Sequence, residues 1–489
     1  MNEIVWRIGF ALLFGLIFAF SARRSPIQPR RRNNGLSTLL FPFTAVALLL
    51  MPVLFSPWSF RHPGQLTGTY LTIFHAITAI FFSILLYDGL LLLLLPWLRK
   101  RIKAVNCALL WLLPCAMPQL YSMLINLASP FKPLFFLRIN GEFFMTLFWV
   151  WLGGFLLAML WQLLSHMRFR RQILRDAIPA DESALRVLWE VEGELCVEAE
   201  RKLVYSRAAQ SPLSIGVFNK SLRIVLPLRN SYSLEALRLI LRHELIHISE
   251  GHNQLKFTMA FVTAFGWFLP TQWLGLRRAA EDLELSCDEQ ATKGLSQEEL
   301  RQYAALILNN AGTAPGFTTC LSASARGLRY RLGRVLHPET RRNGALAVGI
   351  ILTLFILGLG LVGFAPGGGK LGDAIRENRT KPIQVSTLDY GCPDGRVEFD
   401  FVKSVDSEGL LDAIEEIRLY RMPGYSHGSV PGGFGSYPYL QINLEGGGRI
   451  IIHRDAAHRQ CYVYLSNTDS VYLTDRMIDL DALIQNAEP

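Results

Sequence analysis

Apolar runs separated by short basic loops fill the first third of the chain. A helix of about 20 apolar residues crosses the roughly 30 Å of hydrocarbon in a bilayer. Runs close to this length lie at about residues 4–20, 37–55, 70–97, 105–127, 142–164 and 344–364. The pattern predicts six membrane-spanning helices. We expect the first to be retained, because it lacks the basic start and small-residue cleavage site of a signal peptide.

The basic residues of the loops predict how this bundle is oriented. Lys and Arg cluster after the first, third and fifth runs, whereas the alternate loops hold only Arg61, Lys132 and Arg138. Cytoplasmic loops carry the excess of positive charge. Residues 166–343 are therefore predicted to be cytoplasmic and residues 367–489 extracytoplasmic, in a multi-pass protein of the cell (inner) membrane. The predicted domains are 1–165 (five helices), 166–343 (cytoplasmic), 344–366 (sixth helix) and 367–489 (outer).

The composition supports a membrane protein and argues against a nucleic-acid-binding protein. Hydrophobic residues make up 51% of the chain and charged residues only 18%, which is less charge than a soluble domain usually carries. The net charge of +9 resides mainly in the loops beside the apolar runs. We therefore expect the lipid bilayer as a partner and no direct binding of nucleic acid.

The segment between the fifth and sixth runs is mixed α/β. Residues 211–218 and 222–227 are predicted to form two short strands joined by a tight turn. Ser233 is a candidate N-cap for a helix that runs through His247. The first strand, from about Leu213 to Phe218, has the character of a sheet edge to which an extended substrate could add. An ordinary core strand fits the same residues.

The C-terminal segment is rich in β-prone residues. Cys392 and Cys461 are its only two cysteines, and cysteines in an oxidising compartment tend to pair. A disulfide between them is predicted, with two unpaired buried cysteines as the alternative. A Gly-, Ser- and Pro-rich loop is expected at 423–437, and the expected strands are 396–402, 438–444, 448–453 and 461–465.

A metal-binding pattern lies on the predicted helix of the cytoplasmic segment. His243 and His247 are four residues apart and share one helix face, so one Zn²⁺ can take both imidazoles. Glu244 stands beside them, where it can accept a proton from a zinc-bound water. His252 is five residues beyond His247, which places it off that face, and we expect a surface residue there.

A second helix, predicted around residues 281–289, offers the third ligand. Glu281, Glu284 and Asp288 share one of its faces. Glu284 is the preferred ligand and Glu281 the alternative, while Asp288 is placed to accept the second N–H of a ligand histidine. The apolar residues 257–276 cannot then cross the membrane once, since that would separate Glu284 from the histidines. We predict a bent helical pair at the membrane surface or packed on the bundle.

These residues resemble a known family. The strand ending in Ile224-Val225-Leu226-Pro227, the His243–His247 motif, and the segment from Trp267 into Glu284-Leu285-Ser286-Cys287-Asp288 are similar to the BlaR/MecR antirepressor family of membrane zinc peptidases. The similarity covers about residues 140–365. It implies that His243, His247 and Glu284 bind zinc, that Glu244 is the catalytic base, and that a cytoplasmic peptidase is followed by a last span and an outer sensor domain.

The outer segment departs from the family pattern. Residues 367–489 contain neither S-x-x-K nor K-T-G, so sensing by acylation with a beta-lactam is not expected. The expected fold is an α-helical transmembrane bundle with an α/β zincin-type peptidase domain and a small β-rich extracytoplasmic domain.

The expected function is a zinc metalloendopeptidase of the gluzincin type that answers an outer signal by cutting a cytosolic transcriptional repressor or itself. Two alternatives remain open. One is a quality-control or processing protease similar to the HtpX and CAAX-processing enzymes, which pair the same motif with a downstream Glu. The other is a non-catalytic receptor with a structural zinc site, which Glu244 disfavours, because structural sites rarely need a base beside two histidines.

Overall fold

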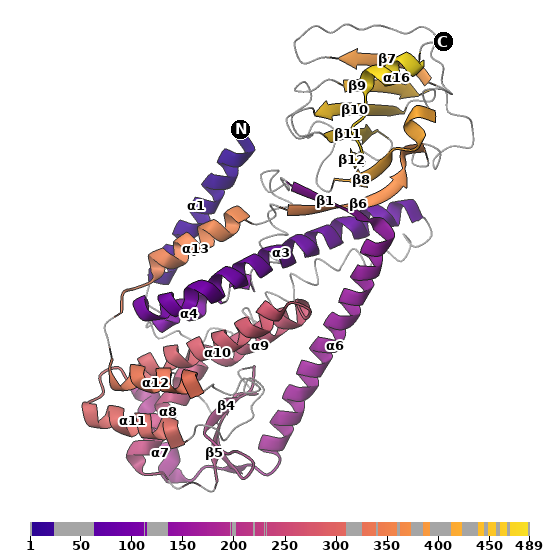
Figure 1. The fold of residues 1–489 in the computed structure, drawn as a ribbon. Helices are drawn as coiled ribbons and strands as arrows, with labels where there is room; N and C mark the ends of the chain where they lie inside the picture. Colours follow the sequence, from indigo (N-terminus) through magenta and orange to yellow (C-terminus); the bar gives the residue numbers. More distant parts are fainter. Residues whose placement is uncertain are drawn as a thin grey trace. The chain divides into compact units, whose positions relative to one another are not determined.

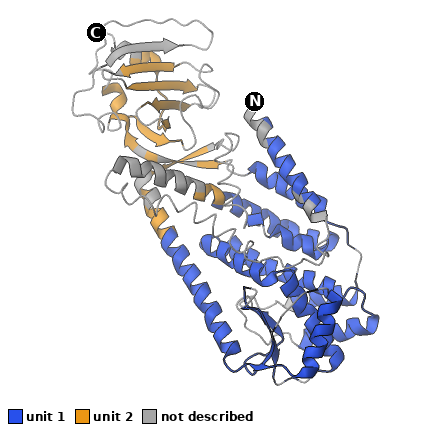
Figure 2. Ribbon diagram, turned by 180° about the vertical axis from the view of Figure 1, so that it is seen from behind, with its two compact units in different colours: residues 1–50, 81–123, 152–359 blue, residues 51–80, 124–151, 360–489 orange. Residues whose placement is uncertain are grey.

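The chain divides into two compact units (Figure 2). Unit one comprises residues 1–50, 81–123 and 152–359, and unit two comprises residues 51–80, 124–151 and 360–489. The computed structural model describes residues 2–23, 63–111, 113–114, 135–195, 197, 202–218, 221–228, 230, 232–309, 325–338, 341–358, 362–372, 385–391, 412–422, 439–444, 448–455, 460–466 and 470–487.

Apolar helices account for much of unit one. They are α1 (Asn2–Arg23), α3 (Pro63–Arg101), α4 (Ala104–Leu110), α6 (Gly141–Leu174) and α13 (Ala345–Gly358), and the division between the units passes through α3 and α6. Among the described residues, the stretches Ile77–Arg101 and Thr146–Leu174 are long and apolar enough to cross a membrane. They correspond to the predicted third and fifth spans. The second predicted span and most of the fourth lie outside the described residues.

The predicted sixth span is shorter than expected. Helix α13 ends at Gly358, and residues 362–370 form a strand instead of the end of the helix. The run from Val362 onward is apolar enough to continue a span, but its backbone pairs with two other strands of unit two. Tertiary pairing has overridden the hydrophobic pattern there, so the predicted end of this helix was wrong.

Helices α1 and α13 lie side by side (Figure 1). Two glycines permit the contact: a Cβ on Gly15 would lie 2.8 Å from the carbonyl oxygen of Gly349, and one on Gly349 would lie 2.9 Å from the oxygen of Gly15. Apolar helices that cannot gain from hydrophobic burial in lipid associate through such close backbone approaches. The pair is therefore held by packing at its small residues.

The mixed α/β part of unit one contains a four-stranded sheet. Its strands β2 (Ile178–Pro179), β3 (Lys202–Ser206), β5 (Arg223–Pro227) and β4 (Leu213–Ile215) follow that order, with β3 and β5 parallel and the other pairs antiparallel. Strand β4 is at the edge, which agrees with the sheet-edge prediction and not with the core-strand alternative, and it is shorter than the predicted 211–218. Gly216, with φ of 114°, turns the chain after β4, where a Cβ would meet the oxygen of Ser221 at 2.4 Å.

Two helices cover this sheet and form its core. Helix α7 (Glu182–Leu195) and helix α8 (Leu234–Ser249) bury Leu188, Leu241 and Leu245 against Ile224 of β5. The predicted cap of α8 is confirmed, because the Ser233 side chain accepts a hydrogen bond from the N–H of Ala236 at 3.2 Å. Helices α11 (Gln297–Asn309) and α12 (Ala325–Leu336) pack beside α8 and α10.

Residues 257–276 form parts of two helices, as the position of Glu284 required. Helix α9 (His252–Phe265) and helix α10 (Pro270–Ala291) are separated by a short turn, with Pro270 at the start of the second. Both pack within unit one: Phe265 lies 4.9 Å from Phe81 of α3, and Phe261 lies 5.7 Å from Phe155 of α6, measured between ring centroids. The bent helical pair is confirmed.

Unit two is built on an eight-stranded sheet. Its order is β1 (Phe135–Asn140), β6 (Val362–Lys370), β8 (Arg418–Arg421), β12 (Ser470–Thr474), β11 (Gln460–Leu465), β10 (Arg449–Asp455), β9 (Tyr439–Leu444) and β7 (Val385–Gly391). Strands β9, β10 and β11 confirm three predicted strands. The predicted strand 396–402 and the loop 423–437 lie outside the described residues.

The sheet joins distant parts of the chain. Strand β1, which precedes α6, pairs in parallel with β6, which follows α13. The remaining pairs are antiparallel. Helix α16 (Leu480–Ala487) covers one face of the sheet, where Leu480 packs with Ile442 and Ile452. The β-rich character was predicted, but the contribution of residues 135–140 was not.

The predicted disulfide is not tested, because Cys392 lies outside the described residues. Cys461 is buried on β11, and its sulfur accepts a hydrogen bond from the N–H of Ile478 at 3.3 Å. Strand β7, which ends at Gly391, is separated from β11 by β10 and β9. The pairing of Cys392 with Cys461 therefore stays a prediction.

Candidate metal centre

Helix α8 presents two imidazoles to one point. His243 and His247 are one helical turn apart, and their Nε2 atoms lie 3.0 Å from each other. Both rings are largely buried, His247 at 3% exposure. Glu244, between them in sequence, is also buried on this helix. The spacing on the helix and the buried surroundings bring two nitrogen donors together away from bulk water.

Helix α10 brings a carboxylate to the same point. The Oε2 atom of Glu284 lies 3.6 Å from Nε2 of His243, and its Oε1 atom lies 3.4 Å from Nε2 of His247. A tetrahedral zinc ion with bonds of about 2.0–2.2 Å separates its ligand atoms by about 3.3 Å. The separation of the two Nε2 atoms, 3.0 Å, and the two nitrogen–oxygen separations, each to a different oxygen of the Glu284 carboxylate, are close to that value. Two nitrogens and one carboxylate would leave a fourth position for water or substrate.

Glu281, the alternative ligand, is engaged elsewhere. Its Oε2 atom accepts from Arg278 at 2.9 Å and from Arg99 at 3.2 Å. These partners lie on α10 itself and on α3. The structure brings Glu284 to the histidines and pairs Glu281 with two arginines.

Cys287 offers a second possible donor. One ligand atom from each of His243, His247 and Cys287 lies within 4.8 Å of the others. The sulfur, however, lies 3.4 Å from Nδ1 of His243 and donates to the backbone oxygen of the same residue at 3.2 Å. Its contact with the His243 ring is therefore at Nδ1, and Glu284 contacts Nε2 of the same ring. We favour Glu284 as the third donor because it lies on the side where the two Nε2 atoms meet.

A chain of hydrogen bonds orients His243. Its Nδ1 atom lies 2.7 Å from the hydroxyl of Tyr303 on α11, and that hydroxyl donates to Oδ1 of Asp288 at 2.7 Å. Asp288 in turn accepts from Nη2 of Arg331 on α12 at 2.9 Å. We expected Asp288 to accept directly from the histidine, but it lies 3.5 Å from Nδ1. The Tyr303 hydroxyl lies 2.7 Å from each of these two atoms and links them.

His252 is not the surface residue that the sequence predicted. It is 4% exposed, and its Nδ1 atom lies 2.8 Å from Nδ1 of His247. The prediction extended the first helix past its real end. Gly251 takes a left-handed conformation, with φ of 69°, and starts α9 in a new direction. Because of that turn, His252 lies beside His247; a continuous helix would have placed it on another face.

Cations surround the carboxylate of Glu284. Lys256 Nζ lies 3.2 Å from its Oε1 atom, and Arg331 Nη2 lies 3.4 Å from its Oε2 atom. Burial raises the pKa of Glu284, but His247 and Lys256 outweigh it and hold that pKa well below the ordinary value. The carboxylate is therefore anionic and ready to bind a cation.

The histidines differ in their charge state before metal binds. Burial lowers the pKa of His247, but Cys287 and Glu284 outweigh it and raise that pKa to about 9. The pKa of His243 is raised above its ordinary value by Cys287, Glu284 and Asp288, again against burial. Burial, His247 and Lys256 instead lower the pKa of His252, which favours its neutral form.

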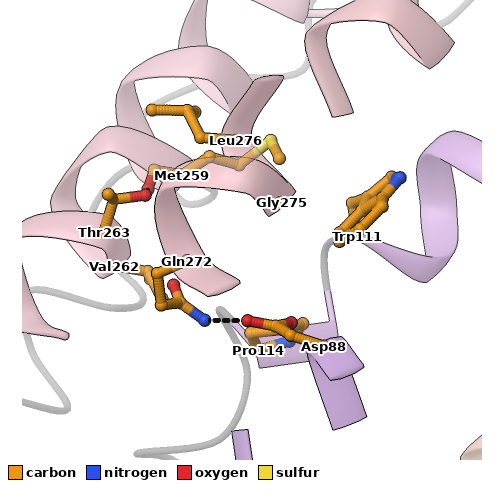
Figure 3. A pocket seen from close by; sticks show the side chains of 9 residues that line it. All are labelled: Asp88, Trp111, Pro114, Met259, Val262, Thr263, Gln272, Gly275 and Leu276. Atoms are coloured by element: carbon orange, nitrogen blue, oxygen red, sulfur yellow. Dashed lines mark hydrogen bonds between the residues drawn. The ribbon is translucent and has the colours of Figure 1, made fainter. Parts of the chain in front are cut away.

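Helix α10 is tied to α3 and α4 along its length. A pocket beside it is lined by Trp111, Gly275 and Thr263, and the amide of Gln272 donates to Asp88 of α3 there (Figure 3). The backbone oxygen of Arg278, six residues before Glu284, accepts a hydrogen bond from Arg99. Asp282, fully buried, accepts from Arg99 Nε at 2.6 Å and from Trp111 Nε1 at 2.9 Å. The position of the Glu284 helix thus depends on the apolar helices.

Two comparisons with known proteins point to the same kind of peptidase. The family described as "BlaR1 peptidase M56" matches residues 135–331, which include every donor named above. The regulatory protein BlaR1 of Bacillus licheniformis is 23% identical over 224 residues, which cover 44% of this chain and 37% of that protein. The matched region thus spans little more than a third of that relative. Over residues 135–331, which contain the helices bearing His243, His247 and Glu284, the chain is similar to the BlaR1/MecR-type family of M56 peptidases.

Proposed function

We propose that this chain is a membrane-embedded zinc endopeptidase with His243, His247 and Glu284 as ligands and Glu244 as general base. The observation that carries the proposal is the convergence of two Nε2 atoms and one carboxylate at separations of 3.0–3.6 Å. Bound zinc would lower the pKa of a water molecule and polarise a peptide carbonyl. The family match supports peptidase activity on a protein substrate.

Different residues of the chain would have different roles in hydrolysis. Glu244 would take the proton of the attacking water and pass it to the leaving amine. Tyr303 and Asp288 hold the His243 ring, and the cations Lys256 and Arg331 offset the negative charge of Glu284. Burial of the two histidines strengthens the interactions that they make, because the local dielectric constant is low.

The edge strand β4 is our proposed docking site for substrate. It is the outermost strand of the sheet beside α8, so one row of its backbone groups has no strand partner among the described residues. An extended peptide can add to such an edge with main-chain hydrogen bonds. A structure with a peptide analogue bound elsewhere would reject this placement.

Signalling from an outer unit to a cytoplasmic peptidase is our preferred role. The charge rule predicts that residues 128–141 and the C-terminal segment lie on the same, outer side. The pairing of β1 with β6 supports that part of the topology, since paired strands share one side. A folded eight-stranded unit attached to a protease favours a sensor over a housekeeping enzyme, and the substrate we propose is a cytosolic repressor or the chain itself.

Two experiments test the proposal at separate levels. The full chain, purified in nanodiscs, should contain one zinc ion and cleave a quenched fluorescent peptide library, while Glu244→Gln should keep zinc and lose cleavage. Equal cleavage by both proteins would remove the enzyme assignment. In cells, proteins cut only by the wild type should be the chain itself or a cytosolic DNA-binding protein. Recovery of misfolded membrane proteins instead would favour the quality-control alternative.

A further inference from the structure

We infer that His252 is a positioning residue of the metal centre, which accepts a hydrogen bond from Nδ1–H of His247 and so directs Nε2 of that ring to the metal. The inference rests on the proposed zinc site. It concerns a residue outside the ligand motif, contributed by a different helix. The observations are a short contact, deep burial and a turn that places the residue.

With metal on Nε2 of His247, the contact determines which of the two rings donates the hydrogen bond. The two Nδ1 atoms are 2.8 Å apart, and the rings meet edge to face with centroids 4.9 Å apart. A neutral imidazole has one N–H donor and one acceptor nitrogen. If His247 binds metal through Nε2, its Nδ1 carries the hydrogen, and Nδ1 of His252 must be the acceptor. The opposite nitrogen of His247 already faces His243 and Glu284.

The backbone explains how His252 reaches this position. The N–H of Gly251 donates to the oxygen of Ile248 at 3.2 Å, and its left-handed conformation ends α8. Helix α9 begins at the next residue, with the side chain of His252 at 4% exposure. A residue with a Cβ is strained at this φ. Gly251 therefore determines whether the accepting ring lies beside His247.

The two ligand histidines have different hydrogen-bond partners. His243 is linked by hydrogen bonds through Tyr303 to the carboxylate of Asp288. His247 instead contacts the imidazole of His252. Carboxylates, carbonyls and water are the usual acceptors behind a metal-bound histidine, and an anionic acceptor makes the ligand more basic. His247 should thus be the weaker donor of the pair, and an anion at position 252 should strengthen it.

The test measures zinc affinity of the full chain in nanodiscs by competition with a chromophoric chelator. His252→Leu should weaken zinc binding by about 10–100-fold. His252→Asn should recover most of the affinity, because its Oδ1 atom occupies the place of Nδ1 and can accept the same bond. His252→Asp should bind zinc at least as tightly as the wild type. His337→Ala, which removes an exposed histidine at the end of α12, is the matched control and should change nothing.

The absorption bands of the Co²⁺-substituted proteins provide a second readout that does not depend on activity. They should shift in His252→Leu and return toward the wild-type spectrum in His252→Asn. Equal affinities and spectra for His252→Leu and His337→Ala would overturn the inference while the zinc site stands. Equal weakening of zinc binding in His252→Leu and His252→Asn would show that His252 acts only through packing, which would overturn the inference. A wild-type chain without zinc would overturn the proposed metal site, and the inference with it.

Discussion

The hydroxyl of Tyr303 lies 2.7 Å from Nδ1 of His243. It also donates to Asp288, so it transmits the effect of a carboxylate to a proposed metal ligand. Tyr303→Phe keeps the ring, which is 97% buried, and removes only this link. We expect zinc affinity to fall by about 10–100-fold, as measured by chelator competition. Unchanged affinity would show that Asp288 alone can orient His243.

Glu244→Gln separates metal binding from catalysis. The amide is similar in shape to the carboxylate but cannot accept the proton of the attacking water. Zinc content should remain at the wild-type level, while the rate of peptide cleavage should fall by at least about 100-fold. Metal analysis and a cleavage assay on the same preparation check both halves. Full activity in this variant would eliminate Glu244 as the base.

Glu284 and Glu281 form a matched pair for testing the third ligand. They lie one turn apart on α10, but only Glu284 faces the histidines, while Glu281 pairs with Arg99 and Arg278. Glu284→Ala should lose zinc, whereas Glu281→Ala should retain it. Zinc content after dialysis against a weak chelator is the measurement. If Glu284→Ala retains zinc, Cys287→Ser becomes the next variant to examine.

Zinc affinity should depend on pH in a defined direction. In the metal-free site the pKa of His247 is raised to about 9, against burial, by Cys287 and Glu284. Zinc must therefore displace a proton at any lower pH, and its apparent affinity should rise as pH rises toward about 9. Each displaced proton contributes about a tenfold change per pH unit. Chelator competition between pH 6 and pH 9 would test this, and a flat profile would contradict it.

Arg99 should stabilise the fold through Asp282. This carboxylate is fully buried and accepts from Arg99 at 2.6 Å. Removing one partner of a buried ion pair leaves an uncompensated charge, at a cost of about 3–5 kcal/mol. Arg99→Ala should therefore lower the thermal unfolding midpoint of the chain in nanodiscs. Arg99→Ala combined with Asp282→Leu should be less destabilised than the single variant, and the opposite order would refute the coupling.

The sequence was most informative where chemistry depends on local spacing. Four residues on a helix place His243 and His247 on one face, and the same reasoning along α10 identified Glu284 and Asp288. Their roles as ligand and supporting acceptor stay predictions. Tyr303, Arg331 and Lys256 reach the site from three other helices, and only packing brings them there. No periodicity in those helices indicates a metal.

Two errors have the same physical origin. His252 was assigned to the surface by extending α8, and Val362 to a span by extending α13. In both cases an apolar or helical pattern continued past the last residue of the helix, which is Ser249 in α8 and Gly358 in α13. Glycine marks such points in the sequence, but whether the chain turns there depends on what it meets afterwards.

The pairing of β1 with β6 also dictates an order of assembly. Strand β1 leaves the ribosome before the peptidase helices, and its partner follows only after α13. Strand β1 therefore cannot pair until the intervening segment has been synthesised. Such contacts between residues distant in sequence form slowly in folding. A fragment beginning at residue 371 lacks both strands and exposes β8 as a new sheet edge. Exposed edge strands promote aggregation. Recombinant versions of unit two should carry residues 135–140 and 362–370 joined to it.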